Sequence, residues 1–135
     1  MIRRFLRVCA ALAAAMVAIL AIQSLNYVLF PPAEGLDPND PEDLLTIVAS
    51  MPAIALWMVE FSYLLGSTIG GFVAVKLARP TAMRPAWVVG LVLMVLGALN
   101  AMQIPQPLWL TVVSLITFVP AAIAGGTWAV RTTRA

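Results

Sequence analysis

The chain has 135 residues, the length of a single domain, but its composition excludes an ordinary soluble protein. Apolar residues make up 62% of it and charged residues only 10%, whereas soluble chains carry roughly a quarter charged residues. It has one cysteine, no histidine and a formal net charge of +2, which excludes an internal disulfide, removes the usual zinc or haem ligands and is too small to indicate nucleic acid. We therefore expect an integral membrane protein with no metal, no cofactor and no nucleic-acid partner.

Four long apolar runs predict the main elements in chain order. A helix of about 20 apolar residues crosses a hydrocarbon layer about 30 Å thick, and the segments between the runs are rich in proline. The predicted transmembrane helices cover about residues 5–30, 52–78, 86–102 and 108–130, joined by an outer loop with a short interfacial helix (31–51), an inner loop (79–85) and an outer turn (103–107). The prediction is an all-α, polytopic membrane protein, a four-helix bundle with one domain over residues 1–135.

The first run also has the basic start and apolar core of a cleaved signal peptide. However, its apolar stretch continues to Phe30, and no small-x-small cleavage site lies at its polar end before Gln23. The residues around Cys9 do not resemble a lipoprotein site, and Cys9 is interpreted as a small apolar filler. We therefore expect this run to remain as the first transmembrane helix.

The outer loop contains the signal for a short helix. Asp40 can cap a helix whose first turn begins at Pro41, and the two acidic residues that follow would lie at the positive end of its dipole. The segment EDLLTIVAS is then predicted to lie as a short helix near the outer membrane interface. After it, Pro52, with Ser50 as a candidate cap, restarts the chain as the second transmembrane helix.

The charged residues fall on opposite sides of the predicted bundle. All eight Lys and Arg residues lie in segments 1–7, 76–84 and 131–134, which four crossings place on one side, and five of the six acidic residues lie in the opposite loop, 31–43. Because Lys and Arg collect on the cytoplasmic side, both termini should be cytoplasmic. Tryptophan prefers membrane interfaces and agrees with this: Trp57 and Trp109 map to the outer boundary, Trp87 and Trp128 to the inner one.

Small residues recur at every fourth position of the second helix: Ser62, Gly66, Gly70 and Ala74. Helices in lipid associate closely where small residues let their backbones approach. Positions four apart drift by about 40° per step, so this stripe winds around the helix and favours a right-handed crossing. We expect it to pack within the bundle, with Gly71 widening the groove. The alternative is an interface with a second copy, as in a homodimer, or with another membrane protein.

Glu60 interrupts the apolar second helix about four residues, or roughly 6 Å, below the outer boundary. A charge within the membrane is costly, so this side chain should face the bundle or a wet crevice. Gln23, Asn26, Asn100 and Ser114 lie at similar depth on the other helices and predict a polar outer tier around it. Either these groups satisfy one another across helices, or they form an outward-facing pocket in which Glu60 binds a proton or a cation.

Three stretches, FPPAEGLDPNDPEDL, LLGSTIGGFVAVKLA and IPQPLW, carry a resemblance over most of the chain. The chain resembles a group of small bacterial four-helix membrane proteins with a Pro-rich first loop, a Gly-rich second helix and an I-P-x-P-x-W turn. The x of that turn is often histidine in the group and is Gln106 here. The resemblance implies a fold and a bacterial cytoplasmic (inner) membrane, and implies no activity. The architecture is also similar to small multidrug transporters, whose membrane glutamate lies in the first helix rather than the second.

No nucleophile–base pair is visible, so we expect no enzymatic activity. The first hypothesis is an accessory or stability factor of the membrane that acts through helix–helix contacts, with the lipid bilayer and another membrane protein as partners. The alternative is a small dimeric transporter or channel with Glu60 as its proton or cation site.

Overall fold

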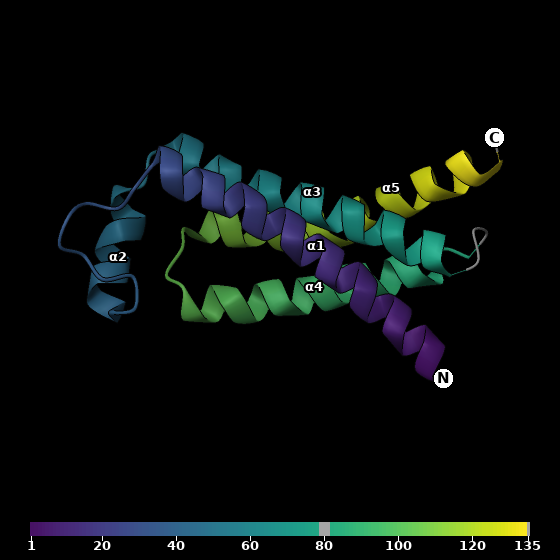
Figure 1. The fold of residues 1–135 in the computed structure, drawn as a ribbon. Helices are drawn as coiled ribbons and strands as arrows, with labels where there is room; N and C mark the ends of the chain where they lie inside the picture. Colours follow the sequence, from purple (N-terminus) through teal and green to yellow (C-terminus); the bar gives the residue numbers. More distant parts are fainter. Residues whose placement is uncertain (79–81, 135) are drawn as a thin grey trace.

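Four long helices lie side by side and a short helix lies across one end of them (Figure 1). The computed structural model describes residues 1–78 and 82–134. The helices are α1 (Ile2–Leu29), α2 (Pro41–Ser50), α3 (Ala53–Leu77), α4 (Arg84–Gln103) and α5 (Leu108–Arg134). All except α2 are long and apolar enough to cross a membrane, and the described residues contain no strand, so the predicted all-α bundle of four spans is confirmed. The predicted inner loop falls partly on residues 79–81, which lie outside the described residues.

The helix ends differ by a few residues from the sequence-based bounds, because charged residues extend the apolar runs. Helix α4 begins at Arg84, two residues before its predicted start, with Pro85 in its first turn, where a missing N–H costs nothing. Helix α5 continues past residue 130 to Arg134, since cations in a last turn are favourable to the helix dipole. It also contains Pro120 within its length.

The cap of α2 is formed as predicted. The Asp40 carboxylate accepts hydrogen bonds from the backbone N–H groups of Glu42, at 2.9 Å, and Asp43, at 3.4 Å. Ser50 does not cap α3, in contrast to the prediction. It belongs to the last turn of α2, where its hydroxyl donates to the Ile47 carbonyl at 2.9 Å, and α3 begins after Pro52 with no side-chain cap.

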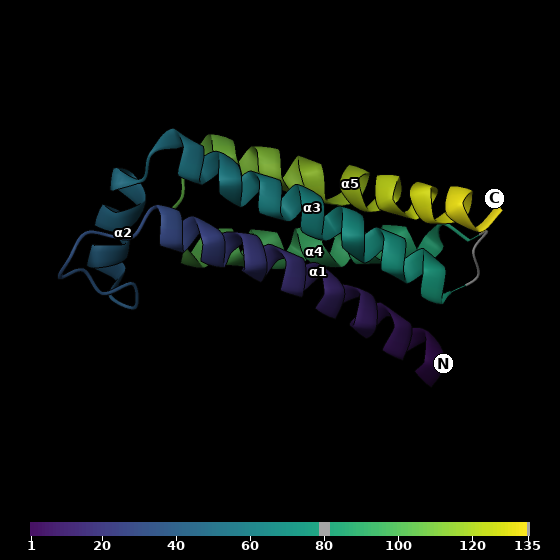
Figure 2. The same cartoon turned by 45° about the horizontal axis from the view of Figure 1, so that its top comes forward.

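Helix α3 lies at the centre of the bundle and contacts α1, α4 and α5 (Figure 2). It is the most buried of the four long helices, and its polar and small residues are spread around its circumference. A helix with no single apolar stripe needs partners on several sides. Helix α3 runs antiparallel to α1 and α4 and parallel to α5, so each of its faces is covered by a different neighbour.

The predicted stripe of small residues packs on α1 within the chain. A Cβ atom added to Gly70 would lie 3.0 Å from the Ala15 Cβ, and one added to Gly66 would lie 2.9 Å from the Ala15 carbonyl oxygen. Ser62 and Ala74, at the two ends of the stripe, are also buried. Helix α1 therefore occupies this surface, and a second copy could reach it only by displacing α1.

Helices α3 and α5 approach each other even more closely. The sequence predicted that Gly71 widens the groove of the small-residue stripe. In the structure Gly71 instead faces the backbone of Ala122 on α5. Gly125 on α5 reciprocally faces the backbone of Thr68 on α3. At both positions an added Cβ would strike backbone rather than a movable side chain, so the two helix axes can lie this close only with glycine.

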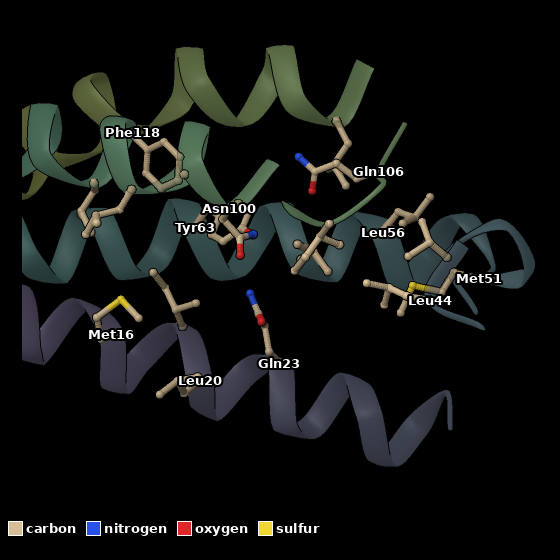
Figure 3. A pocket seen from close by; sticks show the side chains of 18 of the residues that line it. Met16, Leu20, Gln23, Leu44, Met51, Leu56, Tyr63, Asn100, Gln106 and Phe118 are labelled. Carbon is tan, nitrogen blue, oxygen red and sulfur yellow. The ribbon is translucent and has the colours of Figure 1, made fainter. Parts of the chain in front are cut away.

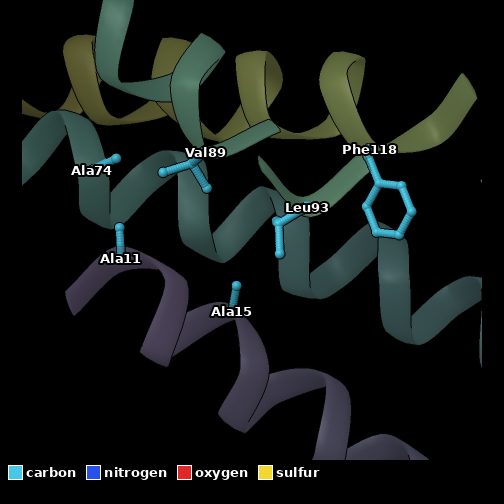
Figure 4. Packing of buried hydrophobic residues seen from close by; sticks show 6 residues of the cluster. All are labelled: Ala11, Ala15, Ala74, Val89, Leu93 and Phe118. Atoms are coloured by element: carbon cyan, nitrogen blue, oxygen red, sulfur yellow. The ribbon is translucent and has the colours of Figure 1, made fainter. Parts of the chain in front are cut away.

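The apolar core joins all four long helices and extends from the middle of the bundle towards the end distant from α2. Figure 4 shows its six side chains. The core consists of Ala11 and Ala15 of α1, Ala74 of α3, Val89 and Leu93 of α4, and Phe118 of α5. A smaller cluster of Val75, Ala86 and Ala129 lies further towards the same end. The two chain termini lie at this end as well, opposite α2 (Figure 1). The compartment that each end faces stays a prediction.

Candidate functional site

Glu60 lies between α3 and α5. Its side chain is 6% exposed, and one carboxyl oxygen, Oε2, lies 2.6 Å from the hydroxyl oxygen of Ser114. Glu60 meets Ser114 because α3 and α5 run parallel. The same pairing brings Phe72 against Trp128 and Lys76 against Thr133 further along the two helices. The other carboxyl oxygen, Oε1, is buried and has no hydrogen-bond partner among the described residues.

The Ser114 hydroxyl has two short contacts and a single hydrogen. Its oxygen lies 2.6 Å from Glu60 Oε2 and 2.7 Å from the Leu110 carbonyl oxygen, one turn earlier on α5. A hydroxyl donates one hydrogen bond, and both neighbours are acceptors when the carboxyl group is ionised. The single Ser114 hydrogen can be shared between the Glu60 carboxyl oxygen and the Leu110 carbonyl oxygen as a three-centre hydrogen bond. The Ser114 hydroxyl therefore links the Glu60 carboxyl group of α3 to the first turn of α5.

Two other polar residues of the predicted tier join α1 to α3. Gln23 donates from Nε2 to the Ser62 hydroxyl at 3.3 Å, and Asn26 donates from Nδ2 to the Ala55 carbonyl at 3.1 Å. Asn26 is 4% exposed, and its carbonyl oxygen is buried without a partner among the described residues. Both side chains therefore serve the α1–α3 contact, on a face of α3 that does not include Glu60.

The fifth predicted residue, Asn100, joins α4 to α3. Its Nδ2 group donates to the Tyr63 hydroxyl at 3.5 Å, at the long limit for a hydrogen bond. The structure thus brings Glu60 together with Ser114, but it places Gln23, Asn26 and Asn100 at other helix pairs. The four polar contacts to α3 in the outer half are divided among three helix pairs and do not form one tier around Glu60.

A cavity of about 450 Å³ lies on the Tyr63 side of α3, between α1 and α4 (Figure 3). Aliphatic side chains form most of its wall, and Gln23, Tyr63, Asn100 and Gln106 contribute its polar groups. Glu60 does not line it. The sequence predicted, as one alternative, an outward-facing pocket around Glu60; the cavity includes Gln23 and Asn100 of that set and is centred on Tyr63 instead. Tyr63 was not predicted, although it follows Glu60 by three residues, a spacing that places both on adjoining faces of one helix.

The described residues contain no group of three His, Cys, Asp or Glu side chains that could hold a metal ion. The polar side chains Gln23, Asn26, Asn100 and Ser114 form hydrogen bonds between helices. The fold and these contacts define a multi-pass α-helical membrane protein. Comparisons of the chain with protein-family models, with curated proteins and with solved structures gave no match.

Proposed function

We propose that the protein is a non-enzymatic accessory or stability factor of a bacterial cytoplasmic (inner) membrane, which acts through helix–helix contacts with a membrane protein. The observation that carries this proposal is the use of the polar residues. Three helices contact α3 through polar side chains: α1 through Gln23 and Asn26, α4 through Asn100 and α5 through Ser114. Polar groups that form hydrogen bonds between helices hold a small bundle in one arrangement.

The packing of the inner half supports the same proposal over a channel. The contacts of Gly71 and Gly125 bring backbones together there, and Val75, Ala86 and Ala129 are fully buried beside them. A solute crossing the bundle would have to pass this close-packed apolar layer. Such a rigid unit suits a protein that presents a fixed apolar surface to a partner.

The surface available to a partner is the lipid-facing side, since the small-residue stripe is covered within the chain. Helix α1 has the smallest buried share of the four spans. Its exposed apolar side chains include Val17, at 68%, and Val28, at 73%. We propose that a partner helix packs on this side of α1.

Purification of the full chain in mild detergent, followed by mass spectrometry of co-purifying proteins, tests this proposal. We expect a membrane protein at a fixed ratio to the chain, and we expect Val17→Trp to remove it. The matched variant Val95→Trp, on the exposed face of α4, should retain it. The proposal fails if no protein co-purifies at a fixed ratio, or if both variants bind the partner as the original chain does.

A second candidate function rests on Glu60, whose Oε2 oxygen is paired with Ser114 and whose buried Oε1 oxygen has no hydrogen-bond partner among the described residues. In this alternative the pair binds and releases a proton as part of transport by a small dimer. Proteoliposomes loaded with a pH-sensitive dye would then show proton flux that Glu60→Gln abolishes. Glu42→Gln, which alters an exposed carboxyl group of α2, should leave the flux unchanged. Equal flux in both variants would exclude Glu60 as the site.

A further inference from the structure

The cavity beside Tyr63 is closed at its inner and outer ends and open on one side. Leu93 and Phe118, which belong to the apolar core, lie at its inner end, and Leu44 and Ile47 of α2 cover its outer end. Its volume of about 450 Å³ is within the range of small-molecule sites, which are mainly apolar with a few placed polar groups. Close-packed interiors do not leave a space of this size empty without losing many contacts.

The open side faces the bilayer. Helices α1 and α4 approach each other in the inner half, where Ala15 and Val89 belong to one core cluster. In the outer half both pack on α3 and the cavity separates them. Leu20 of α1 and Leu96 of α4 line the cavity and are 56% and 46% exposed, so they form the rim of a lateral opening. A molecule entering there comes from the lipid.

The polar groups of the cavity are uncharged, and three of them, Gln23, Tyr63 and Asn100, lie together midway along it (Figure 3). Figure 3 shows Gln23 pointing from α1 towards Tyr63 and Asn100. Gln23 and Asn100 each form one long hydrogen bond within the chain, and in both the amide nitrogen is the donor. Gln23 donates to the Ser62 hydroxyl at 3.3 Å and Asn100 to the Tyr63 hydroxyl at 3.5 Å. The Tyr63 hydrogen and the carbonyl oxygens of both amides therefore remain available to another molecule. None of the described residues that line the cavity carries a charge.

We propose that this cavity binds one uncharged membrane lipid of the diacylglycerol class. The hydroxyl-bearing head group lies among Gln23, Tyr63 and Asn100, where it donates to an amide oxygen and accepts from the Tyr63 hydroxyl. One acyl chain fills the apolar part of the cavity, and the rest of the molecule passes into the bilayer between Leu20 and Leu96. A lipid phosphate is excluded because no cation lies in the cavity to offset its desolvation. This inference does not depend on the proposed protein partner.

The experiment uses the full chain in phosphatidylcholine vesicles that contain a small fraction of diacylglycerol with a diazirine in one acyl chain. After illumination, mass spectrometry of peptides should place the label on the α1 and α4 segments at the cavity. Unlabelled diacylglycerol should compete, whereas phosphatidic acid, which adds only the phosphate, and further phosphatidylcholine should not.

Two pairs of variants test the polar groups and the opening. Asn100→Leu should lower labelling about tenfold, the effect of losing one hydrogen bond in a dry site. Gln103→Leu, one turn further on α4 and outside the cavity, should leave labelling unchanged. Leu20→Trp should block the opening, and Leu25→Trp, exposed on the same helix, should not. If Asn100→Leu fails to fold, Tyr63→Phe removes a hydroxyl at the same place and should also lower labelling.

Three outcomes would overturn the inference. Equal competition by phosphatidylcholine would show that any acyl chain fills the cavity. Equal competition by phosphatidic acid would show that the head group is not selected for neutrality. A covalent cross-link between α1 of one copy and α4 of another, at the cavity rim, would show that a second copy occupies the opening.

Discussion

Among the described residues, Ser114 is the sole hydrogen-bond partner of the Glu60 carboxyl group. Deleting the Ser114 hydroxyl with Ser114→Ala leaves a buried carboxyl group with no partner, and we expect the free energy of unfolding to fall by about 1–3 kcal/mol. Glu60→Gln should cost less, since the new amide can donate to the Ser114 oxygen. Both are measured by unfolding with sodium dodecyl sulfate from mild detergent micelles.

Thr117→Val is the matched control for this prediction. Thr117 lies one turn further along α5, and its hydroxyl donates only to the Val113 carbonyl of its own helix, at 2.8 Å. Losing that bond exposes no unpaired group on another helix. If Ser114→Ala and Thr117→Val destabilise equally, the Glu60 contact contributes nothing that a local bond does not.

Asp37, in the loop before α2, provides a prediction in water. The backbone N–H of Asn39 and then its side-chain amide, both at 2.9 Å, hold the pKa of the Asp37 carboxyl group below its ordinary value. These bonds favour the ionised form, so their contribution to the loop is present above the ordinary aspartate pKa and is lost as the pH falls through the lowered one.

Asn39→Ala removes the side-chain donor and keeps the backbone donor, which has the larger effect. The pKa of Asp37 should therefore rise only part of the way to its ordinary value. Carbon-13 NMR of the carboxyl group across a pH titration measures this. An Asp37 titration curve that does not move would contradict the prediction.

Single residues show how far the site could be predicted. The charge and depth of Glu60 were sufficient to predict that it faces the bundle, and it does. Its pairing with Ser114 rather than with Gln23 depends on how far each helix is rotated about its axis, and the composition of a largely apolar span does not determine that angle. Tyr63 was missed because an aromatic residue in such a span is ordinarily interpreted as core.

At the scale of elements, the α3–α5 contact leads to an ordering of glycine variants. Alanine in a helix is favoured over glycine by about 1 kcal/mol, so only contacts can reverse the sign. A Cβ at Gly71 or Gly125 overlaps backbone, whereas a Cβ at Gly70 lies 3.0 Å from the Ala15 Cβ and 3.1 Å from a Val89 methyl group, contacts that a shift of a few tenths of an ångström relieves. We expect Gly71→Ala and Gly125→Ala to destabilise by more than about 2 kcal/mol, and Gly70→Ala by less.

The same unfolding titration in micelles ranks these variants. Ala124→Gly is the control: Ala124 is exposed on α5, between Ala122 and Gly125 in the sequence, so this variant reports the difference in helix propensity alone. Should Gly70→Ala prove the most harmful, the closest helix pair would be α1 and α3 rather than α3 and α5.

The elements themselves could largely be predicted from local signals, such as the Asp40 cap and the apolar runs. Their partners could not. The four-residue spacing from Ser62 to Ala74 identified one packing face of α3 correctly within the chain. The second face, at Gly71, has no periodic pattern of small residues that would mark it. Its counterpart Gly125 lies 54 residues away along the chain, next to another glycine on α5.

For the molecule as a whole, orientation in the membrane is the main untested expectation. Both termini lie at the end opposite α2 (Figure 1), so charge segregation and the fold require them to share one compartment. In a Cys9→Ser background, a membrane-impermeant maleimide should label Ala33→Cys in intact spheroplasts and Thr133→Cys only after permeabilisation. Labelling of both before permeabilisation would refute the orientation.

The central place of α3 has a consequence for biosynthesis. Of the four spans α3 is the least apolar, and the neighbour that covers its carboxyl group, α5, is made last. Until the ribosome has released the final helix, α3 stands in lipid with Glu60 unsheltered. A nascent chain stopped after α4 should thus be handed to proteolysis or to an insertase chaperone, and completion of the C-terminal helix becomes the event that commits the whole chain to the bilayer.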